Sequence, residues 1–125
     1  MSVFGAGVLM KLASKTDAEI MDVVNPIMDN LMQASTDIDH ARHVRDFSDR
    51  LKSIVTREHL EKVCKRYQAE WGVLDRREVV GIFRRSDSVA VVWKQWCTKT
   101  DDEFVAELVL IEQDDRYLVD HVVFF

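Results

Sequence analysis

Two polar side chains, His121 and Gln95, could serve a binding or catalytic site in otherwise apolar stretches of this chain. A histidine in water has a pKa of about 6.5, so His121 could transfer a proton or form a hydrogen bond near neutral pH. The Gln95 carboxamide could orient a ligand. Both roles require the two side chains to lie on the same face of the structure that carries them.

The segments that contain these residues are typical of strands in an antiparallel meander. Four runs are rich in β-branched and aromatic residues, and the polar turns between them are too short for a parallel crossover. The turns are Ser86–Asp87, Thr100–Asp102 and Asp114–Asp115. The predicted strands are Glu78–Arg85, Ser88–Thr98, Glu103–Gln113 and Tyr117–Phe125.

Closing each turn symmetrically places one residue from each strand in a row across the face that we expect to be buried. Neighbouring strands lie about 4.8 Å apart, so Gln95 and His121 would stand roughly 10 Å from each other, with room for a ligand or ordered water. His121 is then the candidate acid–base residue, and Trp93 forms an apolar wall. The alternative is that helix groups and water satisfy both polar side chains. The predicted ligand-binding residues are Tyr67, Trp71, Glu78, Trp93, Gln95, Leu108 and His121.

The opposite face of the predicted sheet mixes apolar and charged side chains. It is too charged for a deep core and too apolar for plain solvent exposure, which predicts a homodimer through this face. The alternative is that the N-terminal arm covers the face in a monomer. The predicted interface residues are Val92, Lys94, Trp96, Glu107, Ile111, Leu118, Val122 and Phe124.

The first half of the chain carries helical signals. Thr16 and Glu19 have the spacing of a capping box, and apolar residues recur at intervals of three and four as far as Ala34. Pro26 interrupts this pattern because its ring lacks an amide proton. The proline either kinks one long helix or follows a restart that is capped by Asn25.

Further helices are predicted between this first helix and the strands. Two short helical segments cover the region from Ile38 to Ile54, and Ser48 is a suitable cap for the second. The last helix begins after Thr56 and ends at Gly72.

The composition of the chain limits its domain number and the partners that it is expected to bind. A chain of 125 residues with 47% hydrophobic and 31% charged residues is expected to form one domain. A net charge of −5 argues against a surface for nucleic acid or for an anionic membrane. Residues 3–10 are apolar but too few to cross a bilayer. We therefore expect an N-terminal arm over residues 1–15 and a single domain over residues 16–125, with no membrane partner.

Several kinds of chemistry have no support in the sequence. The chain lacks a Gly-x-Ser-x-Gly elbow, a phosphate-binding glycine-rich loop and a His-Glu-x-x-His motif. His40 and His43 lie near aspartates, which is more typical of a hydrated helix surface than of a metal site. Cys64 and Cys97 have no Cys-x-x-Cys spacing and are expected to be buried thiols in a reducing, cytoplasmic setting. We predict neither a metal nor another cofactor.

Helices followed by a consecutive meander predict an α+β domain with the helices on one side of a curved sheet. With the segment His43–Lys52, the helix end Glu70–Gly72 and the last strand Leu118–Phe124, the chain resembles the nuclear transport factor 2-like superfamily, with its cystatin-like cone, and most closely its small uncharacterised bacterial branches. The resemblance implies N-terminal helices packed on the concave face of a four-stranded sheet, around a cavity. It also implies dimerisation through the outer sheet face, which is common in the superfamily.

The resemblance does not supply a reaction. In the related ketosteroid isomerase an aspartate base lies opposite a tyrosine and a protonated aspartic acid. Asp120 falls on the predicted outer face here, and no Tyr and Asp pair occupies inward positions. Three hypotheses therefore remain: a non-catalytic module that binds a small, partly apolar ligand or a peptide; an acid–base enzyme that uses His121; and a structural or interaction protein whose pocket is filled by its own side chains.

Overall fold

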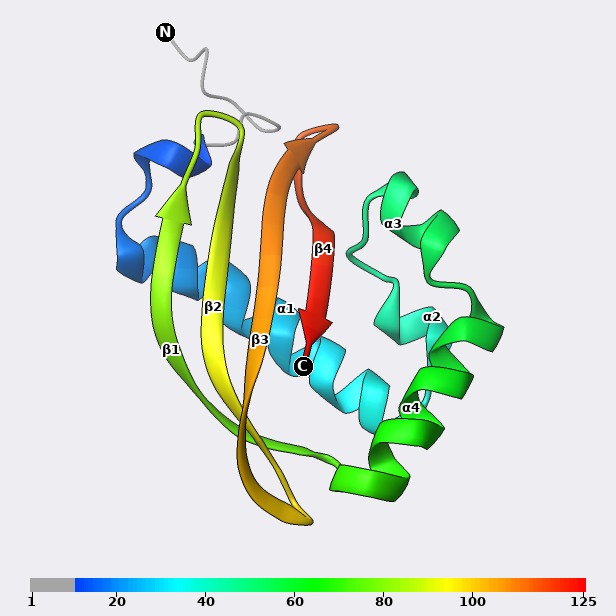
Figure 1. Ribbon diagram of the computed structural model, residues 1–125. Helices are drawn as coiled ribbons and strands as arrows, with labels where there is room; N and C mark the ends of the chain where they lie inside the picture. The colour runs from blue at the N-terminus through cyan, green and yellow to red at the C-terminus, as the bar shows by residue number, and fades with distance from the viewer. Residues whose placement is uncertain (1–10) are drawn as a thin grey trace, which may run out of the picture.

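The computed structural model describes residues 11–125. Within these residues a single 3₁₀ turn, Leu12–Ser14, precedes four helices, and four strands follow them (Figure 1). Leu12 lies in the part of the expected N-terminal arm that is described, and it is buried in the core. No helix in residues 11–125 is both long enough and apolar enough to cross a membrane.

The helices begin where the capping residues predict. Helix α1, Asp17–Asp37, starts with a complete capping box, in which the Glu19 amide donates to Thr16 Oγ1 and the Thr16 amide donates to the Glu19 carboxylate. The helix continues through Pro26, so the restart at Asn25 does not occur. The remaining helices are α2, His40–His43, α3, Asp49–Ile54, and α4, Arg57–Trp71.

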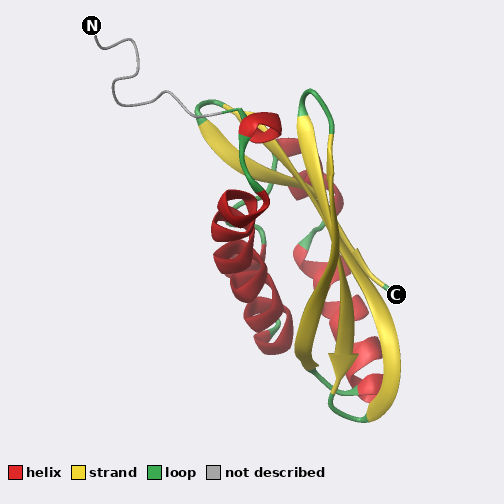
Figure 2. Cartoon of the chain, turned by 90° about the vertical axis from the view of Figure 1, so that its left-hand side faces the viewer, coloured by secondary structure: helices red, strands yellow, loops and turns green. Residues whose placement is uncertain are grey.

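The strands form the predicted meander in the order β1-β2-β3-β4, with each neighbouring pair antiparallel. The helices lie on one side of a curved sheet (Figure 2), so the α+β architecture is confirmed. Side chains from α1 and from the concave sheet face make the main core. The strands are β1, Leu74–Arg84, β2, Ser88–Cys97, β3, Thr100–Gln113, and β4, Arg116–Phe124.

The turn between β2 and β3 lies earlier than the sequence predicted. It is formed by Thr98 and Lys99, whose amides donate to the carbonyls of Val73 and Trp71, and Thr100 already belongs to β3. Gln95 therefore pairs with Phe104 and not with Leu108. The shift is an even number of residues, so each side chain of β2 and β3 keeps its predicted face.

Two β-bulges change the faces that the sequence predicted for β1 and β4. The register of β1 on β2 shifts between Val79 and Gly81, and Glu78 pairs with Lys94 on the outer face. Arg77 takes the inward position, where it forms an ion pair of 2.8 Å with Asp29. The extra residue at a bulge reverses which side chains face inward and which face outward on the strand beyond it.

The second bulge, at Asp120 in β4, reverses the predicted faces of the last residues of the chain. His121 pairs with Val109 and lies on the outer face, whereas Val122 pairs with Leu108 and Phe124 with Ala106 on the concave face. The predicted inward position of His121 is therefore wrong.

Polar contacts from the start of α3 hold this bulge. Ser48 Oγ donates to the Asp120 carboxylate at 2.7 Å, and Arg50 binds both the carboxylate and the carbonyl of Asp120. The Ser48 amide donates to the Val119 carbonyl at 2.8 Å, and the Val119 amide donates to the Asp46 carbonyl at 2.7 Å. Burial raises the pKa of Asp120, but the hydrogen bonds from Ser48 and Arg50 and the nearby positive charges lower it overall.

The link between α4 and β1 leads to a prediction about stability. Gly72 has φ of 86°, and a Cβ there would lie 2.2 Å from Thr98 Oγ1 and 2.9 Å from the Lys99 amide nitrogen. Gly72→Ala should therefore lower the free energy of unfolding by about 2 kcal/mol or more in urea denaturation, because it adds a steric clash to an unfavourable backbone conformation.

Gly81→Ala is the matched control for Gly72→Ala. A Cβ at Gly81 would meet the ring of the exposed Phe83 at 3.0 Å, and this ring can move away. An equal loss of stability in the two variants would contradict the close approach at Gly72.

Candidate functional site

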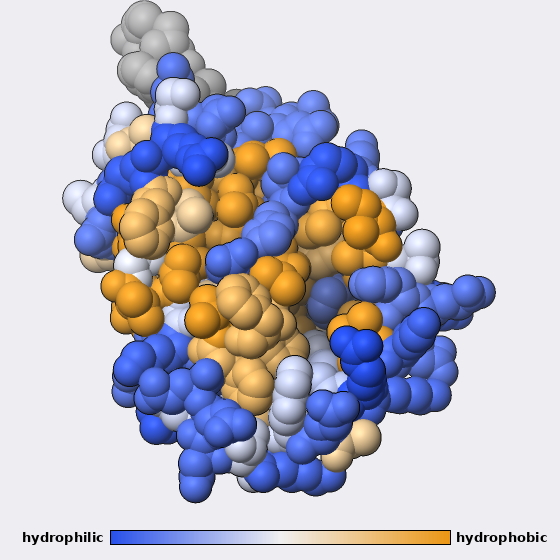
Figure 3. Space-filling model, in the orientation of Figure 1, coloured by the Kyte–Doolittle hydropathy of each residue, from blue (hydrophilic) through white to orange (hydrophobic). Residues whose placement is uncertain are grey.

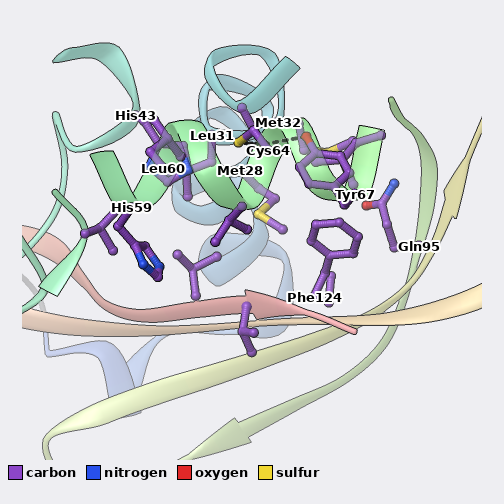
Figure 4. Close-up of a pocket in the computed structure, with 17 residues that line it drawn as sticks. Met28, Leu31, Met32, His43, His59, Leu60, Cys64, Tyr67, Gln95 and Phe124 are labelled. Atoms are coloured by element: carbon purple, nitrogen blue, oxygen red, sulfur yellow. Dashed lines mark hydrogen bonds between the residues drawn. The ribbon is translucent and has the colours of Figure 1, made fainter. Parts of the chain in front are cut away.

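A cavity of about 190 Å³ lies between the concave face of the sheet and the helices α1 and α4 (Figure 4). Most of its lining is apolar. Three residues of β4, Val122, Val123 and Phe124, line the cavity, and the bulge at Asp120 turns Val122 and Phe124 inward. The apolar lining includes Met28, Leu31, Leu60, Ala106, Val122 and Phe124.

Aromatic rings support one wall of the cavity. Tyr67 meets Phe124 edge-on, with 4.9 Å between ring centroids and 89° between ring planes. Trp71 packs against Phe104 at 4.7 Å and against Phe124 at 6.0 Å, although neither Trp71 nor Phe104 lines the cavity. The Phe124 ring at this part of the cavity wall therefore lies against the rings of both Tyr67 and Trp71.

Gln95 on β2 is the most deeply buried polar residue of the cavity, with 1% of its surface exposed. Its Nε2 lies 3.1, 3.2 and 2.8 Å from the carbonyl oxygens of Asp75, Arg76 and Trp96. Its Oε1 is buried and has no hydrogen-bond partner among residues 11–125. An acceptor of this kind costs free energy unless a partner reaches it.

Three further polar side chains at the cavity, Ser35, Cys64 and Tyr67, form hydrogen bonds with one another. The hydroxyl groups of Ser35 and Tyr67 are 2.6 Å apart, and Cys64 Sγ lies 3.4 Å from Ser35 Oγ. Burial raises the pKa of both Cys64 and Tyr67. Both groups are therefore protonated at neutral pH, and Cys64 lacks the thiolate that a nucleophile needs.

His43 places an imidazole at the cavity on the side away from Gln95 (Figure 4). Its ring packs edge-on against Phe47, with 5.3 Å between centroids, and its buried Nδ1 has no partner among residues 11–125. Burial, with a smaller contribution from His40, lowers the pKa of His43 to about 4. The imidazole is therefore neutral at pH 7. His59, which is exposed, also lines the cavity.

The structure brings together only part of the predicted ligand-binding set. Tyr67 and Gln95 line the cavity, whereas Trp71, Trp93 and Leu108 are packed elsewhere inside the fold. Glu78 is an exposed outer-face residue paired with Arg76, and His121 Nε2 lies 3.0 Å from Glu107 Oε1 on the same face. Glu78 and His121 differ from their predicted inward positions because of the two bulges. The sequence did not reveal the bulges, since no turn signal marks an extra residue inside a strand.

Sequence reasoning missed His43 as a cavity residue. The sequence favours a hydrated helix surface for His43 and His40 over a metal site. The available signal was the position of His43 four residues before the apolar Phe47 in a region predicted to be helical, since residues four apart share a helical face. Within residues 11–125 no three side chains of the metal-ligating types lie close enough to hold an ion.

The outer sheet face carries most of the predicted interface residues. Val92, Lys94, Trp96, Glu107, Ile111 and Leu118 lie there, whereas Val122 and Phe124 face inward. Apolar side chains gather over the strands in Figure 3, which has the orientation of Figure 1 with the sheet in front of α1. Strongly exposed residues on β1 and β4 and at the C-terminus include Val80 at 62%, Phe83 at 57%, Val123 at 40% and Phe125 at 61%.

No protein-family model matches the chain, and no curated protein matches it by sequence. Solved structures do match. An NTF2-like protein of unknown function from Pseudomonas putida KT2440 superposes with a TM-score of 0.61 at 15% identity, covering 88% of each chain. An NTF-2 like protein of unknown function from Shewanella oneidensis MR-1 gives a TM-score of 0.53 at 14% identity, covering 84% of this chain and 98% of the other.

A third match has a related description. A protein of unknown function with a cystatin-like fold, from Methylobium petroleophilum PM1, gives a TM-score of 0.50 at 8% identity, covering 83% of this chain and 75% of the other. At these identities the similarity establishes the fold alone. The fold is the one that the sequence resemblance implied.

The environment of His43 predicts how stability depends on pH. The unfolded histidine takes up a proton near pH 6.5, whereas the folded one does so only near pH 4. Stability is therefore unaffected above pH 6.5 and falls as the pH drops between these values. From pH 7 to pH 4.5, the free energy of unfolding of the wild type should fall by about 2 kcal/mol more than that of His43→Gln.

Urea denaturation at several pH values measures this difference, because contributions from the other titrating groups cancel between the two proteins. His59→Gln is the matched control, since it makes the same replacement at an exposed histidine. Identical pH dependence in wild type and His43→Gln would show that His43 is not held neutral by burial.

Proposed function

We propose that this NTF2-like chain is a non-catalytic module that binds a small, mostly apolar molecule in its cavity. The observation that carries the proposal is the cavity of about 190 Å³, lined largely by apolar side chains. Pockets that combine an apolar lining with a few convergent polar groups are typical of small-molecule sites. Gln95 and His43 supply those polar groups.

The volume limits the size of the ligand. An engineered cavity of about 150 Å³ in another protein stays dry and binds benzene. A cavity of about 190 Å³ has room for one ring with a small substituent or for two small fused rings. Peptides and larger ligands would require the cavity to open.

A self-filled pocket is less well supported. Such a pocket would place Trp71, Trp93 or methionine side chains across the space. Trp93 instead packs in the main core, and Trp71 packs against Phe104 and Phe124. Met28 and Met32 line the cavity but leave it open, although flexible thioether side chains are well suited to filling gaps.

Acid–base catalysis is the second candidate function, and His43 Nδ1 is the observation that favours it. His121 cannot take this role in the cavity because it lies on the outer face. A histidine with a pKa of about 4 is a weak base at neutral pH, since efficient bases have pKa values near the working pH. Binding without reaction therefore fits His43 better.

The two cysteines bear on the proposed location. Cys64 and Cys97 are free and buried, and they do not form a disulfide. Free thiols are typical of reducing compartments, which supports a cytoplasmic location.

Filling the cavity should abolish binding. Ala106 is fully buried and lines the cavity, and Ala106→Leu adds three carbon atoms to this space. We expect probes of one ring or two fused rings, including benzene, toluene, phenol and indole, to raise the melting temperature of the wild type but not that of Ala106→Leu. Thermal-shift and NMR titrations measure this difference.

Ala106→Leu could also perturb the core through overpacking, so a second variant tests the cavity without this effect. Val63 lines the cavity and is 37% exposed, and Val63→Trp should narrow access without burying new atoms in the core. The proposal fails if no probe binds the wild type, or if probes bind both folded variants as tightly as the wild type.

We also propose that the chain forms a homodimer through the outer sheet face. Exposed apolar residues, including Phe83 and Val123, lie on this face, and contiguous exposed apolar patches are typical of interaction sites. Charged groups lie on the face as well, where Arg76 stacks on Trp96 at 3.6 Å and His121 pairs with Glu107. Such a mixture of apolar and charged groups suits an interface between copies.

Trp96→Glu should convert the dimer to a monomer in light scattering, because it replaces an apolar ring of the proposed interface with a negative charge. Ile54→Glu is the control, since Ile54 is 52% exposed but lies on α3, away from this face. A wild-type protein that is monomeric at high micromolar concentration would refute the dimer.

A further inference from the structure

We infer that the ligand of the cavity carries a hydrogen-bond donor, such as a hydroxyl or a ring N–H, which binds Gln95 Oε1. The inference rests on the proposed binding function and names its ligand class. Small phenols, indoles and similar donors should be preferred over hydrocarbons, ethers or ketones of the same shape.

The orientation of the Gln95 carboxamide is fixed by its surroundings. Oxygen and nitrogen of an amide are distinguished by their hydrogen-bond partners. All three neighbours of Nε2 are carbonyl oxygens, from Asp75, Arg76 and Trp96, and these can only accept. Nitrogen must therefore occupy that position, and Oε1 must be the atom on the other side.

The structure explains the nitrogen of Gln95 but not the oxygen. The ladder between β1 and β2 is interrupted between Leu74 and Arg77, and Nε2 satisfies carbonyls in this interrupted segment. The Gln95 oxygen takes no part in these hydrogen bonds. It is nevertheless buried and without a partner among residues 11–125, in a residue that is only 1% exposed. A ligand donor would supply the missing hydrogen bond.

The surroundings of Oε1 suit a flat ligand. In Figure 4 the oxygen of Gln95 lies on the side of the carboxamide toward which Tyr67 and Phe124 are drawn. These two rings meet edge-on, with 4.9 Å between their centroids. The Tyr67 hydroxyl is already engaged with Ser35, so a ligand donor competes with no existing bond.

Gln95 determines the polarity of the ligand better than His43 does. A neutral imidazole nitrogen can carry a proton or accept one, depending on the tautomer, so His43 Nδ1 could meet either kind of group. Gln95 Oε1 can only accept. A ligand group placed against it must therefore donate.

Pairs of probes with the same shape test the inference on the unmodified protein. Phenol and toluene differ by a hydroxyl in place of a methyl, and indole and indene differ by an N–H in place of a methylene. Apolar burial alone favours the hydrocarbon of each pair. If Gln95 Oε1 accepts a hydrogen bond, phenol and indole should instead bind at least about fivefold more tightly than their partners in NMR titrations.

The outcomes of the titrations are distinct. Tighter binding of the donors supports the inference. Toluene and indene binding as tightly as phenol and indole, or more tightly, overturns the inference but leaves the proposed binding function intact. Binding of none of the four probes overturns both.

Two variants locate the preference at the Gln95 oxygen. Gln95→Lys removes the acceptor but supplies three N–H donors for the three carbonyls, whereas Gln95→Met removes both functions. In whichever variant folds, toluene should still bind and the preference for phenol should disappear. A preference for phenol that survives in a folded variant would overturn the assignment to Gln95.

Discussion

The polar contacts between the start of α3 and the bulge of β4 determine which side chains the cavity receives. Ser48 and Arg50 bind Asp120, and the backbone around Phe47 pairs with Val119. These contacts hold one extra residue in β4, which turns Val122 and Phe124 toward α4. Without the bulge, His121 would face the cavity in their place. A polar contact at the sheet edge thus controls the composition of an apolar interior.

The two bulges also separate the charged groups of the protein from its cavity. Glu78 and His121 are moved outward, and each lies beside an opposite or complementary partner in an exposed setting. Arg77 moves inward but is neutralised by Asp29 and lies 5.7 Å above the Trp93 ring. Apart from the exposed His59, the polar groups that line the cavity are neutral at pH 7: the Gln95 carboxamide, the Ser35 and Tyr67 hydroxyls, the protonated Cys64 thiol and the uncharged His43 imidazole. This environment suits recognition by hydrogen bonds better than stabilisation of charge.

Local signals were sufficient for the helices, because capping residues such as Thr16, Ser48 and Thr56 act within one helical turn. The meander followed from short polar turns. The faces of β4 could not be predicted because its end, Val122–Phe125, is apolar at every position and no alternation marks the bulge. Gln95 was placed correctly since β2 shifts by an even number of residues. His43 was missed because its burial depends on packing between distant segments.

The free edge of the sheet has a consequence for how the molecule avoids uncontrolled association. Residues 46–48 pair with β4, whereas β1 has β2 as its only strand partner in the described part of the chain. A strand edge with Val79 and Val80 half exposed or more is a template for addition of another chain, as in amyloid. The bulge between Val79 and Gly81 interrupts the regular spacing of its backbone donors and acceptors, so an incoming strand cannot pair along its whole length. The same irregularity that moves Glu78 outward therefore guards the protein against aggregation.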